Sequence, residues 1–259
     1  MNAEEVKRAA MEFGADLAGI TPATRLDRLP VESRPTTLSS RIRSVVVVGH
    51  RILRGALRGI EEGTNFHSTY RFYGSAIQED HFLSRTAYQL ACRMERDGHE
   101  AIPLLSARKN QDGFLPDYQA YAHAAGLGSV GKGGFFLTPR FGHRQRFALV
   151  FTDAELDGDP VIETSFCDNC AACVDACPLH ALAVSDKPGQ PAELKLERCR
   201  ECRNGAFPEE NRADPVDRYA AACGRACLAA LEGRTENRFV EPFRKRGVWT
   251  IGAPAGEKW

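Results

Sequence analysis

The sequence has little that would place this chain in a membrane, outside the cell or on nucleic acid. It contains no apolar run of about 18 residues, the length that a membrane-spanning helix needs. Residues 1–7 lack the basic stretch that precedes the apolar run of an export signal, and no twin-arginine pair stands there. Basic and acidic residues number 34 each, so the net charge is zero and a large nucleic-acid footprint is not expected. We therefore expect a cytoplasmic protein with no membrane or nucleic-acid partner.

Cysteine, in contrast, is abundant, with nine in the chain. Residues 167–178 have the spacing C-x2-C-x2-C-x3-C-P that wraps a cubane iron–sulfur cluster in bacterial-type ferredoxins. Three closely spaced thiolates bind one cluster, and the fourth, before the proline, ligates a different one. Many thiols without an export signal also favour metal ligation over disulfides. The motif therefore predicts a second cluster whose other ligands follow in the chain.

Four more cysteines follow, spaced C-x2-C at 199–202 and C-x3-C at 223–227. A copy of the first motif would place a cysteine at Ala220, and Cys202 can replace that missing ligand. We assign two 4Fe-4S clusters: the first to Cys167, Cys170, Cys173 and Cys227, and the second to Cys177, Cys199, Cys202 and Cys223. Zinc at the C-x2-C pairs, disulfides and a single cluster are the alternatives.

Apolar periodicity predicts an α/β sandwich over the first part of the chain. Helices are expected at 2–13, within 70–97 and at 118–125. Strands are expected at 15–20, 44–49 and 100–105, and at 135–138 and 146–152 joined by a turn. The β-branched run at 45–48 indicates a strand buried on both faces. Cys92 lies on the apolar side of the second helix and is expected to be a small core residue.

A polar segment at 153–160 divides the chain into domains. We expect an α/β domain at 1–160, a small α-rich, ferredoxin-like cluster domain at 161–232, and a C-terminal tail at 233–259. The cluster domain has an acidic excess and the tail a basic one. The tail is therefore expected either to lie back on the cluster domain or to be solvated.

A glycine-rich loop precedes the cysteines. Gly126, Gly128 and Gly131 match G-x-G-x-x-G, but a dinucleotide fingerprint follows a strand and opens a helix, and this loop does the reverse. Glycines let backbone N–H groups approach closely, so the loop with Lys132 is a candidate for binding an anionic or amide-bearing ligand. A tight connection without a ligand is the alternative.

The order of these motifs resembles the epoxyqueuosine reductase and reductive dehalogenase superfamily. Ala-Gly-Leu-Gly-Ser-Val-Gly-Lys at 125–132, the segment 135–146, Thr-Asp at 152–153 and the cysteine run follow one another as in that family. The resemblance implies an α/β corrinoid-binding domain joined to a two-cluster ferredoxin-like domain, with a base-off cobalamin between them. Gly126, Gly128, Gly131 and Lys132 would then border the cofactor.

The function that this resemblance implies is an iron–sulfur oxidoreductase, a corrinoid-dependent reductase of a small molecule. Its electrons would come from an external donor such as a ferredoxin or flavodoxin. Asp112, Asp117 and Tyr118, just before the glycine loop, are the candidate proton donors. The alternatives are an electron-transfer protein without corrinoid that reduces a protein partner, and an epoxyqueuosine reductase of tRNA queuosine synthesis. Neutral charge does not favour the tRNA substrate, and the missing export signal does not suit a respiratory dehalogenase.

Overall fold

A four-stranded antiparallel sheet forms the centre of the α/β part of the chain. The computed structural model describes residues 1–62, 70, 73–74, 77–104, 114–184, 191–208, 216–237, 239 and 241. The strand order is β1 (Leu17–Pro22), β2 (Ser44–Arg51), β6 (Gln145–Thr152) and β3 (Ala101–Leu104), and every pairing is antiparallel. The valines at 45–48 have no exposed surface, so the expected burial of this strand on both faces is confirmed.

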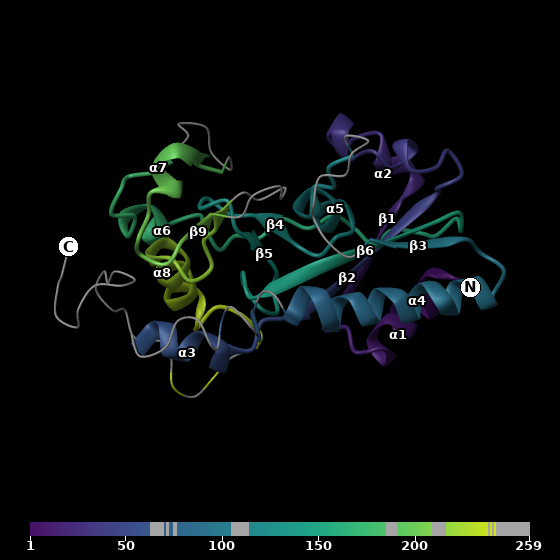
Figure 1. Cartoon of the computed structure of the whole chain (residues 1–259), viewed down its shortest axis with the longest axis horizontal. Helices are drawn as coiled ribbons and strands as arrows, with labels where there is room; N and C mark the ends of the chain where they lie inside the picture. Colours follow the sequence, from purple (N-terminus) through teal and green to yellow (C-terminus); the bar gives the residue numbers. More distant parts are fainter. Residues whose placement is uncertain are drawn as a thin grey trace.

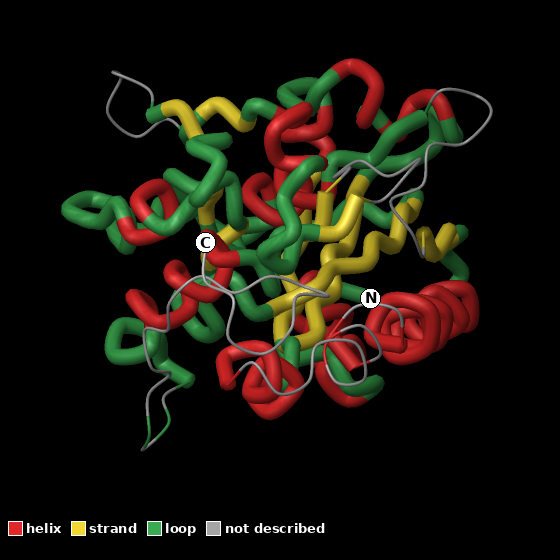
Figure 2. Tube along the Cα trace, turned by 60° about the vertical axis from the view of Figure 1, so that its left-hand side comes forward, coloured by secondary structure: helices red, strands yellow, loops and turns green. Residues whose placement is uncertain are grey.

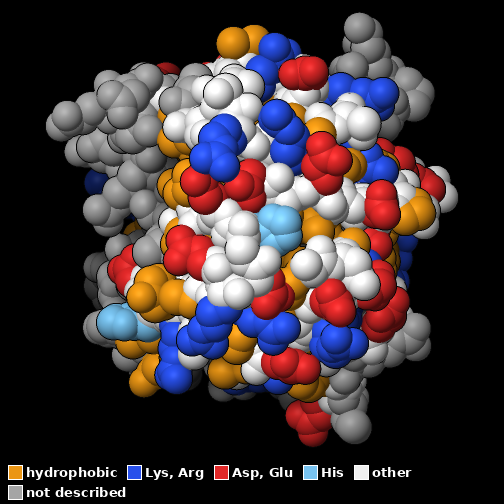
Figure 3. All heavy atoms as spheres, turned by 90° about the vertical axis from the view of Figure 1, so that its right-hand side faces the viewer, with side chains coloured by type: hydrophobic (Ala, Val, Ile, Leu, Met, Phe, Trp, Pro, Cys, Tyr) orange, Lys and Arg blue, Asp and Glu red, His pale blue; other side chains and the backbone are white. Residues whose placement is uncertain are grey.

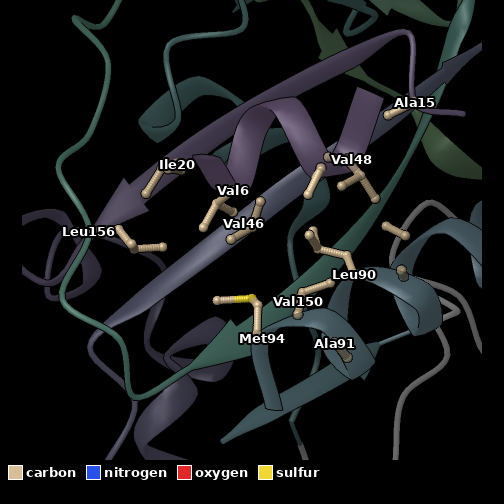
Figure 4. Packing of buried hydrophobic residues seen from close by; sticks show 14 of the residues in the cluster. Val6, Ala15, Ile20, Val46, Val48, Leu90, Ala91, Met94, Val150 and Leu156 are labelled. Carbon is tan, nitrogen blue, oxygen red and sulfur yellow. The ribbon is translucent and has the colours of Figure 1, made fainter. Parts of the chain in front are cut away.

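Helices cover both faces of this sheet (Figures 1 and 2). α1 (Ala3–Glu12) and α4 (Ser84–Arg96) pack on one face, where Val6, Leu90 and Met94 lie against the valines of β2 (Figure 4). α2 (Ala23–Leu26) and α5 (Tyr118–Ala124) pack on the other, and Tyr121 of α5 meets Phe151 of β6 edge-on at 5.7 Å between ring centroids. The expected α/β layering is thus confirmed as a mixed α/β structure.

Local sequence sets the ends of α1. The Asn2 side chain accepts a hydrogen bond from Glu5 N at 2.9 Å, and Glu5 Oε2 accepts one from Asn2 N at 2.9 Å, which is a capping box. Gly14 follows the helix at φ +103°, a conformation that favours glycine. The helix predicted over 2–13 is therefore confirmed, with Asn2 as its cap.

The helix predicted within residues 70–97 is confirmed as α4 (Ser84–Arg96). A π-helical segment, η4 (Gln78–Leu83), precedes α4, and part of the range 70–77 lies outside the described residues. Ala87, Leu90, Ala91 and Met94 make the buried face of α4, whereas Cys92 is only partly buried. The expectation that Cys92 is a core residue is therefore wrong, because position 92 falls at the edge of the buried face.

The expected hairpin between 135–138 and 146–152 does not form. β6 pairs with β2 along one edge and with β3 over Leu149–Thr152 on the other, and β5 (Phe136–Leu137) is not part of this sheet. β5 pairs instead with β4 (Ser129–Val130) inside the glycine loop. The turn between β5 and β6, closed by a bridge between Thr138 and Gly142, thus connects two different sheets.

Short elements surround a separate core in the cysteine-rich part, at the end of the molecule opposite α4 and β3 (Figure 1). The helices are α6 (Ala172–Asp175), α7 (Leu196–Arg200) and α8 (Ala222–Leu231). The paired strands are β7 (Leu182–Ala183) with β8 (Glu193–Leu194), and β9 (Phe207–Pro208) with β10 (Val216–Asp217). Phe135 and Leu137 also belong to this core. The domain boundaries at 160 and 232 and the ferredoxin-like character remain predictions.

The remaining described elements are two short turns, the helix α3 and the start of the tail. The 3-10 turns η1 (Val31–Ser33) and η2 (Pro35–Thr37) follow α2. α3 (Arg54–Glu62) follows β2, and its Leu57 packs with Ala220 and with Leu228 of α8. At the described start of the tail, Glu236 N donates to Pro139 O at 3.1 Å, and Asn237 N donates to Arg140 O at 2.9 Å. The tail therefore begins against the turn before β6, and most of its remainder lies outside the described residues.

Over the described residues, no helix is both long and apolar enough to cross a membrane. On the face in Figure 3, basic and acidic side chains are interspersed. This face thus carries no broad field of one sign.

Candidate metal centre

Eight cysteines come together in two groups of four. One pocket is lined by Cys167, Cys170, Cys173 and Cys227. A second is lined by Cys177, Cys199, Cys202 and Cys223. These are the two sets assigned from the sequence, and the other lining residues of both pockets are apolar or glycine. We call them the first and second pockets; that they bind clusters remains a prediction.

The helix α8 contributes one thiol to each pocket. Cys223 and Cys227 are four residues apart on α8, hence one above the other on adjacent turns. Cys177, which ends the first motif next to Pro178, lies with the second group. Each cysteine motif therefore contributes one thiol to the other motif's group: Cys177 lies in the second group and Cys227 in the first.

Backbone N–H groups point at several of these sulfurs. Lys132 N donates to Cys167 Sγ at 3.3 Å, Ala181 N to Cys177 Sγ at 3.3 Å, and Asn204 N to Cys202 Sγ at 3.4 Å. Such hydrogen bonds stabilise thiolate charge and are among the factors that set cluster potentials. Both pockets are thus prepared for negatively charged sulfur.

The donor chemistry of both pockets fits an iron–sulfur cluster. Burial raises the pKa of Cys173 to about 11 and that of Cys199 to about 12, and a bound cation would favour their thiolate form. Sets of soft thiolates are the ligands of iron–sulfur clusters, and zinc also accepts them. Within the described residues, no three His, Cys, Asp or Glu side chains are grouped to hold one ion.

The glycine loop is fitted to the first pocket. A Cβ atom on Gly133 would lie 2.8 Å from Cys173 Sγ, and one on Gly131 would lie 3.0 Å from Cys167 Sγ. Lys132 Nζ donates to Cys170 O at 2.9 Å. Glycine at 131 and 133 thus leaves room for the sulfurs of Cys167 and Cys173. Lys132 holds the cysteine-bearing segment through its hydrogen bond to Cys170 O.

The glycine loop also makes contacts with the rest of the protein, and its expected role beside a corrinoid remains a prediction. Gly131 N donates to Phe135 O and Gly134 N to Gly131 O, both at 2.8 Å. Cβ atoms on Gly126 and Gly128 would collide with backbone oxygens of the chain itself. α5 precedes the loop and β5 follows it, as expected for a loop that is not a dinucleotide fingerprint. The structure gives Gly126, Gly128, Gly131 and Lys132 protein partners, and cobalamin binding rests on resemblance.

The three candidate proton donors differ in their surroundings. Asp117 caps α5, because its Oδ1 accepts from Gln119 N at 3.0 Å and from Ala120 N at 2.9 Å. The Tyr118 hydroxyl is buried without a hydrogen-bond partner among the described residues, and burial raises its pKa. Asp112 lies outside the described residues. Of the two candidates described, Asp117 is engaged in capping α5, whereas the Tyr118 hydroxyl has no hydrogen-bond partner among the described residues.

A buried polar network that the sequence analysis missed joins the two parts of the chain. The Tyr70 hydroxyl lies 2.8 Å from both carboxylate oxygens of Asp217, and Arg146 Nη2 lies 2.7 Å from Asp217 Oδ2. Burial alone would raise the pKa of Asp217, but the Arg146 charge and the hydrogen bonds hold it below its usual value. No spacing rule links these distant positions in sequence, so only the fold shows that they meet.

His143 is a second buried polar group at this junction. It has no exposed surface, its Nε2 lies 2.8 Å from Gly224 O, and its Nδ1 has no hydrogen-bond partner among the described residues. Burial lowers its pKa to about 4. The ring is therefore neutral at pH 7, and its Nε2–H donates to the first turn of α8.

Known proteins with similar sequences fall into two groups. No family model matches the chain. A tetrachloroethene reductive dehalogenase of Desulfitobacterium hafniense is 33% identical over 125 residues, which cover 47% of this chain and 21% of the dehalogenase. An epoxyqueuosine reductase of a Synechococcus strain is 33% identical over 110 residues, covering 40% of this chain and 32% of the reductase. The match thus spans between about a fifth and a third of these relatives.

Solved structures give the same two groups. A reductive dehalogenase, described as suggesting a mechanism for B12-dependent dehalogenation, has a TM-score of 0.58 and 19% identity, and covers 91% of this chain and 32% of its own. An epoxyqueuosine reductase from Bacillus subtilis has a TM-score of 0.51 and 17% identity, covering 88% and 80%. These likenesses show the fold. The resemblance read from the motifs, to the superfamily of reductive dehalogenases and epoxyqueuosine reductases, is confirmed.

Proposed function

We propose that this protein is an iron–sulfur oxidoreductase of that superfamily, one that passes electrons through two 4Fe-4S clusters to a small-molecule substrate. The observation that carries the proposal is the grouping of eight thiols around two pockets that share α8. When bound, the clusters supply single-electron transfer. The α/β part, residues 1–160, would hold the substrate, and residues 161–232 the clusters.

The chain's own residues position the sulfurs and exclude water. Apolar side chains such as Phe166 and Leu231 line the first pocket beside the glycine loop. Backbone N–H groups that donate to Cys167, Cys177 and Cys202 help to hold these sulfurs in place. A site lined in this way protects clusters from solvent and keeps electrostatic interactions strong.

Reductive cleavage of a carbon–halogen or carbon–oxygen bond consumes two electrons and one proton for each bond broken. The electrons come from the external donor, the leaving group departs with the bonding pair, and the carbon gains the proton. We place that proton on Tyr118, because Asp117 is occupied in capping α5 and the Tyr118 hydroxyl has no other partner among the described residues. Tyr118→Phe should lower turnover and leave the iron content unchanged.

Cobalamin is the cofactor that separates the reductase from an electron carrier. Its support is the likeness to a dehalogenase described as B12-dependent, and the glycine loop adds none. The proton transfer assigned to Tyr118 does not depend on cobalamin. The electron carrier, with clusters and a protein partner but no corrinoid, is therefore retained as the alternative.

The test is anaerobic reconstitution with iron and sulfide, followed by titration with cobalamin. Two clusters predict about eight irons per chain. Corrinoid that stays with the protein through gel filtration supports the reductase, and loaded clusters without corrinoid binding at tens of micromolar support the carrier. About four irons, or one or two zinc ions, would contradict the proposal.

Epoxyqueuosine reductase activity is the second candidate, since such reductases stand among the relatives beside the dehalogenases. Its substrate is tRNA-borne according to the superfamily resemblance, while the described face in Figure 3 carries interspersed charges of both signs. Reduced, reconstituted protein incubated with epoxyqueuosine-containing tRNA tests this candidate. Conversion of the modified base there, with no reduction of halogenated small molecules, would favour it.

A further inference from the structure

The second pocket opens at the surface of the cysteine-rich part, away from the α/β part. Its described lining residues all come from 177–223, whereas the first pocket is also lined by residues between 131 and 137. Pro178, in the wall of the second pocket, is exposed, and Leu179 and Cys202 are half-buried. α7, which contributes Cys199, lies at the end of the molecule opposite α4 and β3 (Figure 1). An electron can therefore enter this pocket from outside without crossing the α/β part.

An excess of exposed positive charge lies beside this pocket. Residues 195–203, which include two of its thiols, carry four exposed basic side chains, Lys195, Arg198, Arg200 and Arg203. Glu197 and Glu201 are the acidic residues in the same run, so its net charge is +2. One ion pair offsets part of it, because Arg200 Nη1 lies 3.5 Å from Glu197 Oε1. The arginines at 198 and 203 thus provide most of the outward positive charge.

The cysteine motif of the first pocket has the opposite sign. Residues 163–175 contain no Lys or Arg and three exposed acidic side chains, Glu163, Asp168 and Asp175. Two cations reach this motif from elsewhere, since Lys132 Nζ donates to Cys170 O and Arg234 Nη1 to Phe166 O. The sum is still −1. A negatively charged partner is therefore attracted to the second pocket and not to the first.

Pro178 and Leu179 give this surface an apolar centre. Both line the second pocket together with the two thiols of the basic run, so they lie beside that run. Lys195 N also donates to Ala181 O at 2.8 Å, which holds the residue before α7 against the segment after Pro178. An apolar centre within a polar rim is the usual construction of a protein–protein interface, and a charged rim steers the approach of the partner.

We propose that an acidic one-electron donor protein docks on this surface and reduces the cluster of the second pocket. The donor surface consists of Pro178, Leu179, Arg198, Arg200 and Arg203. The inference rests on the proposed function, because it requires loaded clusters and an external donor. One electron leaves the donor, which is oxidised by one electron, and enters the cluster, which is reduced by one; no covalent bond forms or breaks.

The test measures reduction of the iron-loaded full chain by a flavodoxin, an acidic donor, in its hydroquinone form. The flavin becomes a semiquinone as one cluster is reduced, so stopped-flow absorbance follows both partners. The wild-type rate constant should fall at least fivefold when the ionic strength rises from about 0.01 M to about 0.1 M. Over that range the Debye length shortens from about 30 Å to about 10 Å and screens the attraction.

A variant that combines Arg198→Glu, Arg200→Glu and Arg203→Glu removes the positive field of the donor surface. At the lower ionic strength, flavodoxin should reduce this variant at least tenfold more slowly than the wild type, because steering affects the association rate most. Oxidised flavodoxin should also bind it at least tenfold more weakly, measured by surface plasmon resonance with the loaded chain. The binding measurement requires no electron transfer and reports on docking alone.

The matched control reverses three arginines at the opposite end of the molecule. Arg85, Arg93 and Arg96 of α4 are all exposed, and Arg93 is paired with Asp97 in its own helix at 3.4 Å, as Arg200 is with Glu197. Their replacement by Glu makes the same change in net charge and should leave the rate near that of the wild type. Reduced methyl viologen, a small cationic reductant, should reduce the wild type and both variants without the slowing.

The outcomes distinguish this inference from the proposed function. Wild-type protein without about eight irons, or with clusters that methyl viologen does not reduce, refutes the two-cluster function itself. A loaded, viologen-reducible wild type that flavodoxin does not reduce, rates independent of salt, or equal slowing in the α4 variant each overturn the donor surface. If the triple variant loses iron, Arg203→Glu alone, which lies outside α7, makes the same comparison with an expected slowing of at least twofold.

Discussion

Replacing Gly133 with Ala tests whether the glycine loop serves the first pocket. The added Cβ would lie 2.8 Å from Cys173 Sγ and 3.1 Å from the Phe135 ring. Both neighbours are buried, so neither side chain can move away freely. Because Cys173 is one of only four thiols around this pocket, the methyl group would displace a sulfur that has to bind iron.

The cost follows from the packing. Forcing a methyl group into a filled interior costs about 1–3 kcal/mol. At 1.4 kcal/mol for each factor of ten, the affinity of the first pocket for its cluster should fall by about 5- to 140-fold. The second pocket has no contact with Gly133 among its lining residues and should load normally. Under limiting iron and sulfide, the chain should thus move from about eight irons toward about four.

Iron and sulfide analysis after reconstitution, with electron paramagnetic resonance of the reduced protein, measures this loss. Gly55→Ala is the control, because a Cβ at Gly55 of α3 would meet nothing within 4 Å. That variant should keep all its iron and gain slightly in stability, since Ala favours a helix over Gly. A Gly133→Ala protein with full iron and an unchanged first-cluster signal would refute the steric argument.

Three further predictions, tested with five substitutions, concern other parts of the structure. Burial lowers the pKa of His143 from 6.5 to about 4. Between these pH values the unfolded chain binds a proton at His143 that the folded chain does not, so the free energy of unfolding should fall as the pH decreases from 6.5 to 4. The free energy of unfolding should change by about 1.4 kcal/mol per pH unit in this range. Urea titrations of the apoprotein at several pH values should show a weaker pH dependence for His143→Gln than for the wild type, and equal pH dependence in both would contradict this. Cys202→Ser should lose about four irons and Cys92→Ser none, whereas equal losses would disprove the ligand sets. Asp117→Ala should lower the free energy of unfolding by about 1 kcal/mol in urea titrations, and Asp117→Asn, which caps equally well, should not; the same loss in both variants would rule out capping as the reason.

The features that the sequence predicted depend on short-range patterns. The capping box at Asn2 and Glu5, the β-branched run at 45–48 and the cysteine spacing each lie within a dozen residues. Helix caps, buried strands and thiolate spacing follow from local geometry, so each could be read before the fold was known. The division of the thiols into two sets followed from the same motif.

The features that could not be predicted depend on contacts between distant segments. Nothing in residues 135–152 shows that β6 pairs with β3, or that β5 pairs with β4 instead of with β6. Nor does the sequence near Lys132 show that its amine binds Cys170 O, 38 residues later. Nor does it show that the Nη1 of Arg218, five residues before Cys223, donates to the carbonyl oxygen of Gly133, 85 residues earlier.

The sharing of α8 by both pockets has a consequence for the order in which the protein is made. When synthesis has passed Cys202, six of the eight pocket thiols exist, three for each pocket. The missing two arrive together, one turn apart, on α8. Neither group of thiols is therefore complete until synthesis has passed Cys223 and Cys227, and both are completed within four residues of one another. A chain that stops anywhere before Cys223 leaves both groups without their fourth thiol.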